Sequence, residues 1–255
     1  MWGQSSLPAT ARLTGMATAR RNAGFRKRAV SAGLAEKLKL QAINVVLIAT
    51  YHSPSVITPG FLSSQKIISR HWLPKQTIIT PIGVSIVYNE NVSFTGDQNR
   101  LEIKHEYAGD SGRLGDVFRI ADRLVFTLPH VPYRQIGMNW FLVVEEDNAS
   151  SWIVSKFMKE SDPGNLSVNL CSASVTCQYE LPDCKLNIGF TPSDPSPHGD
   201  RRPSLINVNV NFHHDISSSR EAQSALACWK HYNAVAENAL NNIFGSKIDE
   251  IADSP

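Results

Sequence analysis

The segment 205–213 constrains the fold most, because apolar and polar residues alternate along it without interruption. Its apolar set is Ile206, Val208, Val210 and Phe212. Its polar set is Asn207, Asn209 and Asn211. Successive side chains of a β-strand point to opposite faces of a sheet. The segment therefore predicts a sheet with one buried face and one polar face, as in an antiparallel sheet that carries its helices on a single side.

From residue 39 onward, the chain shows the same order of elements twice: a strand, a helix, several strands and a helix. In the first half, residues 39–130, we expect strands at 39–50, 77–88, 92–95 and 100–107, and helices from Thr58-Pro59 and over 116–128. In the second half, residues 131–247, we expect strands at 133–145, 166–171, 173–181, 185–191 and 205–213, and helices at 148–158 and 217–244. These halves predict an α+β fold with one antiparallel sheet and helices on one face. Residues 248–255 are expected to form a tail.

Positive charge is concentrated at the amino-terminal end of the chain. Residues 1–40 carry eight Lys or Arg and one Glu, a formal charge of +7, whereas the remainder has 17 basic and 22 acidic residues, a charge of −5. We therefore predict that residues 1–38 form a disordered basic arm. The arm is open to three interpretations: an organelle transit peptide, a solvated extension, or a tail that binds nucleic acid. In the last of these, phosphates would be contacted by Arg20, Arg21, Arg26, Lys27 and Arg28.

The composition argues against several classes of protein. No apolar run approaches the ~18 residues that a membrane-spanning helix needs, so we expect no membrane association. The four cysteines include no Cys-x-x-Cys pair and match neither a zinc ribbon nor a disulfide framework. The glycine-rich segment 109–115 lacks the spacing of a phosphate-binding loop. With no secretory signal pattern either, we expect a cytoplasmic protein without a cofactor or a bound metal.

The densest polar cluster is His213-His214-Asp215, at the end of the alternating strand. Imidazole and carboxylate groups are typical of metal sites and of acid–base catalysis, and His105 is a further candidate for such a site. Adjacent residues of a strand point to opposite faces, so the two adjacent histidines can share a metal only if the strand ends between them. In the structural alternative, Asp215 begins a turn and helps to cap the following helix through the segment 217–219.

The row of three asparagines at 207, 209 and 211 is unusual, because Asn is depleted in strands. On one face of a sheet, these residues predict a polar surface that hydrogen-bonds a ligand or partner. Arg201 and Arg202, in the preceding loop, would add contacts to an anion. The alternative is a solvent-facing strand that polar residues keep soluble.

Two resemblances follow from these elements. The repeated strand–helix–strands–helix order is similar to the duplicated saddle of the TATA-binding-protein fold. The aromatic wedges with which that family kinks DNA have no identifiable counterpart in the sequence, so the similarity implies architecture alone. The segments 131–139 (Val-Pro-Tyr-Arg-Gln-Ile-Gly-Met-Asn) and 207–215, with the closing helix, resemble a sporadically distributed family of uncharacterised bacterial proteins. That resemblance covers a small part of the chain, and it implies a small bacterial protein with no catalytic residues to carry over.

Three hypotheses about function remain open at this point. The leading one is a non-catalytic binding or regulatory module that acts through its exposed sheet face, on a protein partner or on a second copy of itself. It combines the polar strand face with the absence of a recognisable catalytic motif in the sequence. The alternatives are a metal-dependent or hydrolytic enzyme that uses His213, His214 and Asp215, and a nucleic-acid-binding protein that uses the basic arm.

Overall fold

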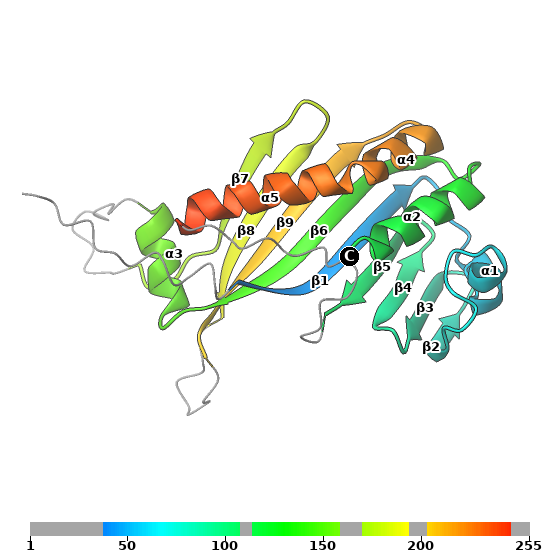
Figure 1. The fold of residues 1–255 in the computed structure, drawn as a ribbon, viewed down its shortest axis with the longest axis horizontal. Helices are drawn as coiled ribbons and strands as arrows, with labels where there is room; N and C mark the ends of the chain where they lie inside the picture. The colour runs from blue at the N-terminus through cyan, green and yellow to red at the C-terminus, as the bar shows by residue number, and fades with distance from the viewer. Residues whose placement is uncertain (1–37, 108–113, 159–169, 194–202, 246–255) are drawn as a thin grey trace, which may run out of the picture. The chain divides into compact units, whose positions relative to one another are not determined.

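A computed structural model of the chain describes residues 38–107, 114–158, 170–193 and 203–245. All of the described residues belong to one compact unit. Its described part is a nine-stranded antiparallel sheet with helices against one face, shown in Figure 1. The predicted α+β class is therefore confirmed. Apart from Leu38, the predicted arm (1–38) lies outside the described residues, as does the tail (248–255).

The elements follow one another in the predicted order. The strands are β1 (Leu38–Ala49), β2 (Pro74–Ile79), β3 (Gly83–Tyr88), β4 (Val92–Asp97), β5 (Arg100–Glu106), β6 (Tyr133–Glu145), β7 (Val175–Glu180), β8 (Lys185–Ser193) and β9 (Leu205–Asp215). The helices are the short 3-10 helix η2 (Pro54–Val56), α1 (Pro59–Ser64), α2 (Asp116–Thr127), α3 (Ala149–Phe157), α4 (Ser219–Ala227) and α5 (Trp229–Phe244).

The first strand of each half lies at the centre of the sheet. The order of strands is β2-β3-β4-β5-β1-β6-β9-β8-β7, so β1 pairs with β6. The last strand of each half, β5 or β9, flanks this central pair, and the other strands run outward to the edges. Both halves therefore contribute to one continuous sheet and share one hydrophobic core.

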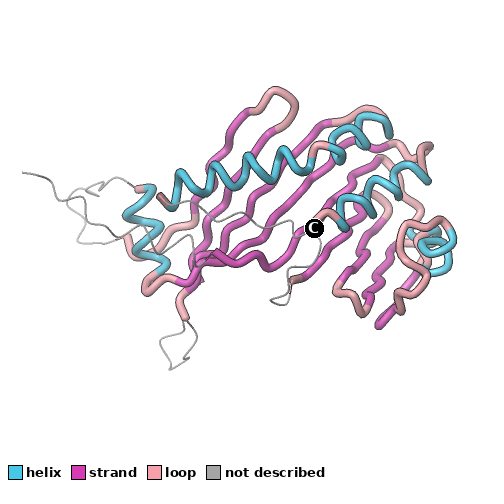
Figure 2. Tube along the Cα trace, in the orientation of Figure 1, coloured by secondary structure: helices cyan, strands magenta, loops and turns pink. Residues whose placement is uncertain are grey.

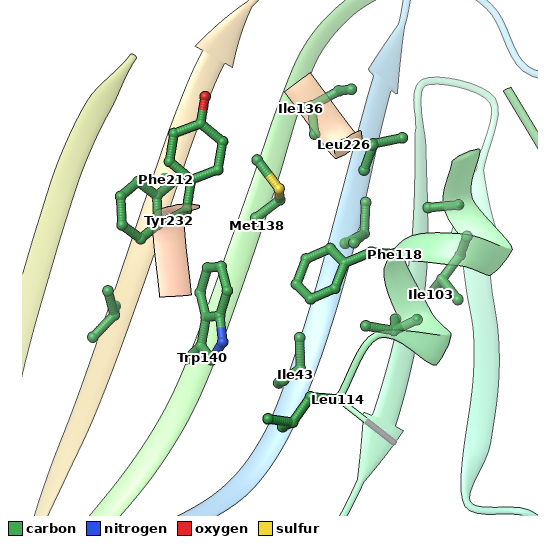
Figure 3. Packing of buried hydrophobic residues seen from close by; sticks show 14 of the residues in the cluster. Ile43, Ile103, Leu114, Phe118, Ile136, Met138, Trp140, Phe212, Leu226 and Tyr232 are labelled. Atoms are coloured by element: carbon green, nitrogen blue, oxygen red, sulfur yellow. The ribbon is translucent and has the colours of Figure 1, made fainter. Parts of the chain in front are cut away.

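The core lies between the sheet and the helices that cross it in Figure 2. Trp140 of β6 is at its centre, with the ring of Phe118 from α2 at 5.5 Å and the ring of Phe212 from β9 at 5.4 Å. Phe212 in turn lies 4.9 Å from Tyr232 of α5. Figure 3 shows these rings together with Ile43 and Met138 from the same face of the sheet. Aromatic rings of both halves therefore join the two sets of helices to the central strands.

Three sequence-based expectations about the elements were wrong in detail. The strand expected over 77–88 is instead a hairpin of two antiparallel strands, β2 and β3. The helix that begins at Pro59 has the predicted Thr58 cap but ends at Ser64, because Lys66 adopts a left-handed φ of 57°. The helix expected over 217–244 is divided at Cys228 into α4 and α5. Its apolar spacing continues across the break, so the sequence carries no signal for it. The strand expected at 166–171 stays a prediction for residues 166–169, which lie outside the described ranges; residues 170 and 171 are not in a strand.

Candidate functional site

A β-bulge in β1 decides which of its side chains face the helices. The register between β1 and β6 shifts between Leu40 and Ala42, so Gln41 is the extra residue. One extra residue reverses the alternation of faces for the rest of the strand. Beyond the bulge, Ile43 therefore points into the core, and Asn44 points to the opposite surface of the sheet.

Alternate residues of all nine strands point away from the helices. We call the part of this surface that is formed by the five adjacent strands β5, β1, β6, β9 and β8 the open face. The predicted binding residues Asn207, Asn209 and Asn211 lie on this face, the first two exposed and the third half-buried. Arg201 and Arg202, the other predicted binding residues, lie outside the described residues.

Four asparagines from four neighbouring strands are directly opposite one another on the open face. Asn44 of β1 is opposite Asn139 of β6, which is opposite Asn211 of β9. Asn211 is in turn opposite Asn187 of β8. We call this row, which runs across the strands, the asparagine ladder.

The ladder is held by hydrogen bonds that all run in one direction. Asn187 donates to Asn211 at 3.2 Å, Asn211 donates to Asn139 at 2.8 Å, and Asn139 donates to Asn44 at 2.6 Å. Asn44 then donates to a carboxylate oxygen of Glu102 at 2.9 Å. Each bond polarises the next in such a chain, and the acceptor at its end is a full negative charge.

The ladder stabilises the centre of the sheet and also leaves unused hydrogen-bonding capacity. Asn44 is only 4% exposed and Asn139 only 9%, so their amides depend on each other rather than on water. An amide has two N–H donors and two acceptor positions. Asn44, Asn139 and Asn211 each use one of each within the ladder. A donor and an acceptor position therefore remain at each of these three residues.

Of the four ladder residues, only Asn211 was predicted as a binding residue from the sequence. The other three were missed because each is a single asparagine in an apolar or mixed strand, as in Ile43-Asn44-Val45 and Met138-Asn139-Trp140. A usable signal was present: asparagine is depleted in strands, and here it recurs in four of them. The strand pairing that brings the four together is not visible in the sequence.

A groove of about 540 Å³ lies beside the ladder, along β1 and β5. Asn44 and Ala42 lie in it, together with Phe141 of β6 and with Lys104 and Glu106 of β5. The groove therefore combines an aromatic ring, a ladder amide and charged groups in one place. Clefts that bind ligands have this mixture of apolar surface and a few placed polar groups.

The open face carries equal numbers of basic and acidic side chains. The basic side chains are Lys39, Arg100, Lys104 and Lys185, and the acidic ones are Glu102, Glu106, Glu145 and Asp215. Three ion pairs form among them: Lys39–Glu145 at 2.8 Å, Arg100–Glu102 at 2.6 Å and Lys104–Glu106 at 2.6 Å. The open face is thus polar but has no net charge.

The candidate catalytic cluster is not brought together. His213 and Asp215 lie on the open face, with His213 Nε2 and Asp215 Oδ1 3.7 Å apart, whereas His214 points into the core. His105 points to the core side of β5, three strand spacings from β9, or about 14 Å away. No three His, Cys, Asp or Glu side chains in the described part of the chain could hold a metal ion.

Asp215 does not begin the cap of the following helix; the residues that follow it do. β9 continues through Asp215, and the cap of α4 is Ser218, whose hydroxyl accepts from the backbone N–H of Glu221 at 3.2 Å. The carboxylate of Glu221 accepts in return from the backbone N–H of Ser217 at 2.7 Å. These reciprocal bonds stabilise the first turn of α4 in the manner of a capping box.

The sequence did not reveal that buried His214 and Tyr232 lie beside the exposed Asp183 and form a polar cluster. The Tyr232 hydroxyl donates to Asp183 at 2.5 Å, and this bond is the main reason that the pKa of Asp183 is lowered. His214 is 3% exposed and its Nε2 has no partner among the described residues. Burial lowers its pKa, although Asp183 acts in the opposite direction. Burial raises the pKa of the adjacent Cys184 to about 12, so its thiol is not activated as a nucleophile.

Comparison with known proteins does not identify the chain. No family model matches the sequence, and none of the curated proteins matches it. None of the helices in the described ranges is long and apolar enough to cross a membrane.

The ladder predicts unequal effects for two asparagines on the same face. We expect Asn139→Ala to lower the free energy of unfolding by about 1–3 kcal/mol, since it removes the partners of the Asn44 oxygen and the Asn211 amide. The matched control, Asn209→Ala, removes an exposed side chain. It should change the free energy of unfolding by less than about 0.5 kcal/mol. Urea unfolding of both variants measures the difference. Equal values would mean that the ladder contributes nothing to stability.

His214 predicts a pH dependence of stability. Because its pKa in the folded protein is below the usual value of 6.5, the unfolded chain takes up a proton as the pH falls through 6.5 and the folded chain does not. Stability due to neutral His214 is therefore complete above pH 6.5 and decreases below it. In His214→Gln, the unfolding free energy should fall less steeply between pH 7.5 and pH 5.5 than in the parent. The control is His130→Gln, a change at an exposed histidine, in which the unfolding free energy should depend on pH as in the parent. The prediction is contradicted if His214→Gln also shows the pH dependence of the parent.

Proposed function

We propose that the protein is a non-catalytic binding protein that holds a polypeptide partner on its open face. The observation that carries this proposal is the asparagine ladder: a row of fixed amides on a neutral sheet surface, whose unused donor and acceptor positions are accessible at the half-buried Asn187 and Asn211. A peptide group offers the same pair, one N–H and one C=O. The ladder is therefore complementary to a partner that presents backbone or side-chain amides.

Apolar side chains on both sides of the ladder support a protein partner. Val46 and Ile48 lie on one side, and Ala42, Phe141 and Val143 lie on the other, with all but the alanine half-buried. Apolar groups interspersed with fixed polar ones are the usual composition of a protein interface. A partner that covers them would gain from their burial, while the amides would determine its position.

The size of the open face is adequate for a stable interface. The five strands of the open face, at about 4.8 Å spacing, span about 19 Å, and strands of about ten residues are about 33 Å long. The product, about 630 Å², lies within the range of roughly 600–1,000 Å² that one partner contributes to an interface of standard size. The neutral charge balance speaks against a phosphate backbone as the ligand of this face, because such ligands are recognised by excess positive charge.

We further infer a cytoplasmic location from the cysteines. All four (Cys171, Cys177, Cys184 and Cys228) are described, and all are free thiols. Free thiols are typical of reducing compartments. Binding of nucleic acid through Arg20, Arg21, Arg26, Lys27 and Arg28 stays a separate prediction, since these residues lie outside the described ranges.

The proposal is tested by selection from a random peptide library displayed on phage. The full-length chain should enrich peptides, and synthetic copies of these should bind at least tenfold more weakly to Asn209→Arg, which places a bulky charge in the middle of the open face. Asn89→Arg, at an exposed turn outside the open face, is the matched control and should bind like the parent.

Two outcomes would overturn the proposal. Either the library yields no binding peptides, or the selected peptides bind equally well to Asn209→Arg. Circular dichroism and urea unfolding of both Arg variants would establish that each one keeps the parent fold.

A further inference from the structure

On the side of the sheet that carries the helices, the segment after α1 and the first turn of α2 enclose a hollow. A cavity of about 520 Å³ lies there, within the range of small-molecule sites. Residues that line it include Lys66, Arg70, Trp72, Asp116 and Arg119. The open face and its ladder take no part in this cavity.

The cavity concentrates positive charge. Three of its lining residues, Lys66, Arg70 and Arg119, are cationic, and Asp116 is the one carboxylate among those that line it. Asp116 forms an ion pair with Arg119 at 3.3 Å. Neither Lys66 nor Arg70 has a side-chain hydrogen-bond or ion-pair partner in the described part of the chain. Two cations without partners in one cavity are the arrangement that attracts an anion.

This concentration contrasts with the charge of the surroundings. The described residues as a whole carry 13 Lys or Arg and 14 Asp or Glu, a formal charge of −1. The four charged residues of the cavity sum to +2. The positive potential is therefore local to the cavity and does not result from a generally basic surface.

The segment that supplies the cations is held in place by the core. Lys66 has a left-handed backbone with φ of 57°, which turns the chain sharply after α1. Its N–H donates to the carbonyl of Ser63 at 3.1 Å, and the N–H of Ile67 donates to the carbonyl of Leu62 at 2.9 Å. Ile67 and Ile68 are buried in the core. A lysine adopts this conformation only where the surrounding structure requires it, so the turn is fixed before any ligand binds.

Two further residues of the cavity, Trp72 and Asp116, could contact the organic part of a phosphate ester, which inorganic phosphate lacks. Trp72 is half-buried against Tyr88, with ring centroids 5.8 Å apart, and it also lines the cavity. Its indole offers a flat surface for a planar ring. Asp116 can accept hydrogen bonds from the hydroxyl groups of a sugar, as acidic residues do in nucleotide sites.

We propose that this cavity binds a nucleoside phosphate, with Lys66 and Arg70 on the phosphate group and Trp72 against the base. Arg119 stands beside the phosphate position, and Asp116 faces the sugar. This site is independent of the proposed peptide-binding function, and either can hold without the other.

Calorimetric titration of the full-length chain with AMP, ATP, adenosine and inorganic phosphate, in 150 mM salt, tests the site. AMP or ATP should bind, inorganic phosphate should bind at least tenfold more weakly, and adenosine should give no measurable binding. Lys66→Gly is the decisive variant, because glycine suits the left-handed backbone at this position and the fold is retained while the charge is removed. It should weaken binding at least tenfold, as should Arg70→Gln.

Lys185→Gln, on the open face, is the matched control and should bind like the parent. The proposal is overturned if neither nucleotide binds. It is also overturned if binding persists unchanged in Lys66→Gly and Arg70→Gln, which would place it elsewhere, for example on residues 1–37. Tighter binding of a single-stranded oligonucleotide that is lost in the same two variants would make the cavity part of a nucleic-acid surface, and would equally contradict a small-molecule site.

Discussion

The pairing of β1 with β6 is the interaction on which the rest of the structure depends. These are the first strands of the two halves, and they lie side by side at the centre of the sheet. Ile43 and Trp140 lie opposite each other on the core side, and Asn44 and Asn139 lie opposite each other on the open face. One register therefore aligns the hydrophobic core and the hydrogen-bonded ladder together. A slip by one residue would expose the apolar set and bury the asparagines against the helices.

The bulge at Gln41 makes this register possible. Without the extra residue, the alternation of faces set by Leu38 and Leu40 would continue, and Asn44 would point into the core. With it, the residues that face the helices are Leu38 and Leu40 before the bulge and Ile43, Val45 and Leu47 after it. Bulges near functional surfaces commonly redirect side chains in this way. In this protein the bulge directs an amide to the position where it joins Asn139 and Glu102.

The sequence was most informative where one strand carries the whole signal. The alternation from Ile206 to Phe212 predicted both faces of the sheet correctly, and with it the layer of helices on one side. The Thr58 cap was also readable because capping is local chemistry. Features that depend on partners distant in sequence were not readable. The ladder needs four strands in register, and the polar cluster of Asp183, His214 and Tyr232 joins a hairpin turn, a strand and a helix.

Because of the register of the central strands, the two surfaces of the sheet have different chemistry. The core side is aromatic and aliphatic, and its buried His214, with the exposed Asp183 beside it, does not form a nucleophilic site. The open face is neutral and rich in amides, and it supports the proposal of a polypeptide-binding function. The cation-lined cavity near Lys66 and Arg70 supports a separate ligand of opposite charge.

The exchange of side-chain amide protons with solvent, measured by nuclear magnetic resonance, tests the central claim most directly. If the ladder is formed, the amide protons of Asn44 and Asn139 that lie in hydrogen bonds should exchange at least tenfold more slowly than those of Asn207 and Asn209, which are exposed on the same face. Asn211, which is half-buried, should be intermediate. Equal exchange at all five residues would mean that the amides are open to water individually, and would contradict the account of a fixed ladder across the central strands.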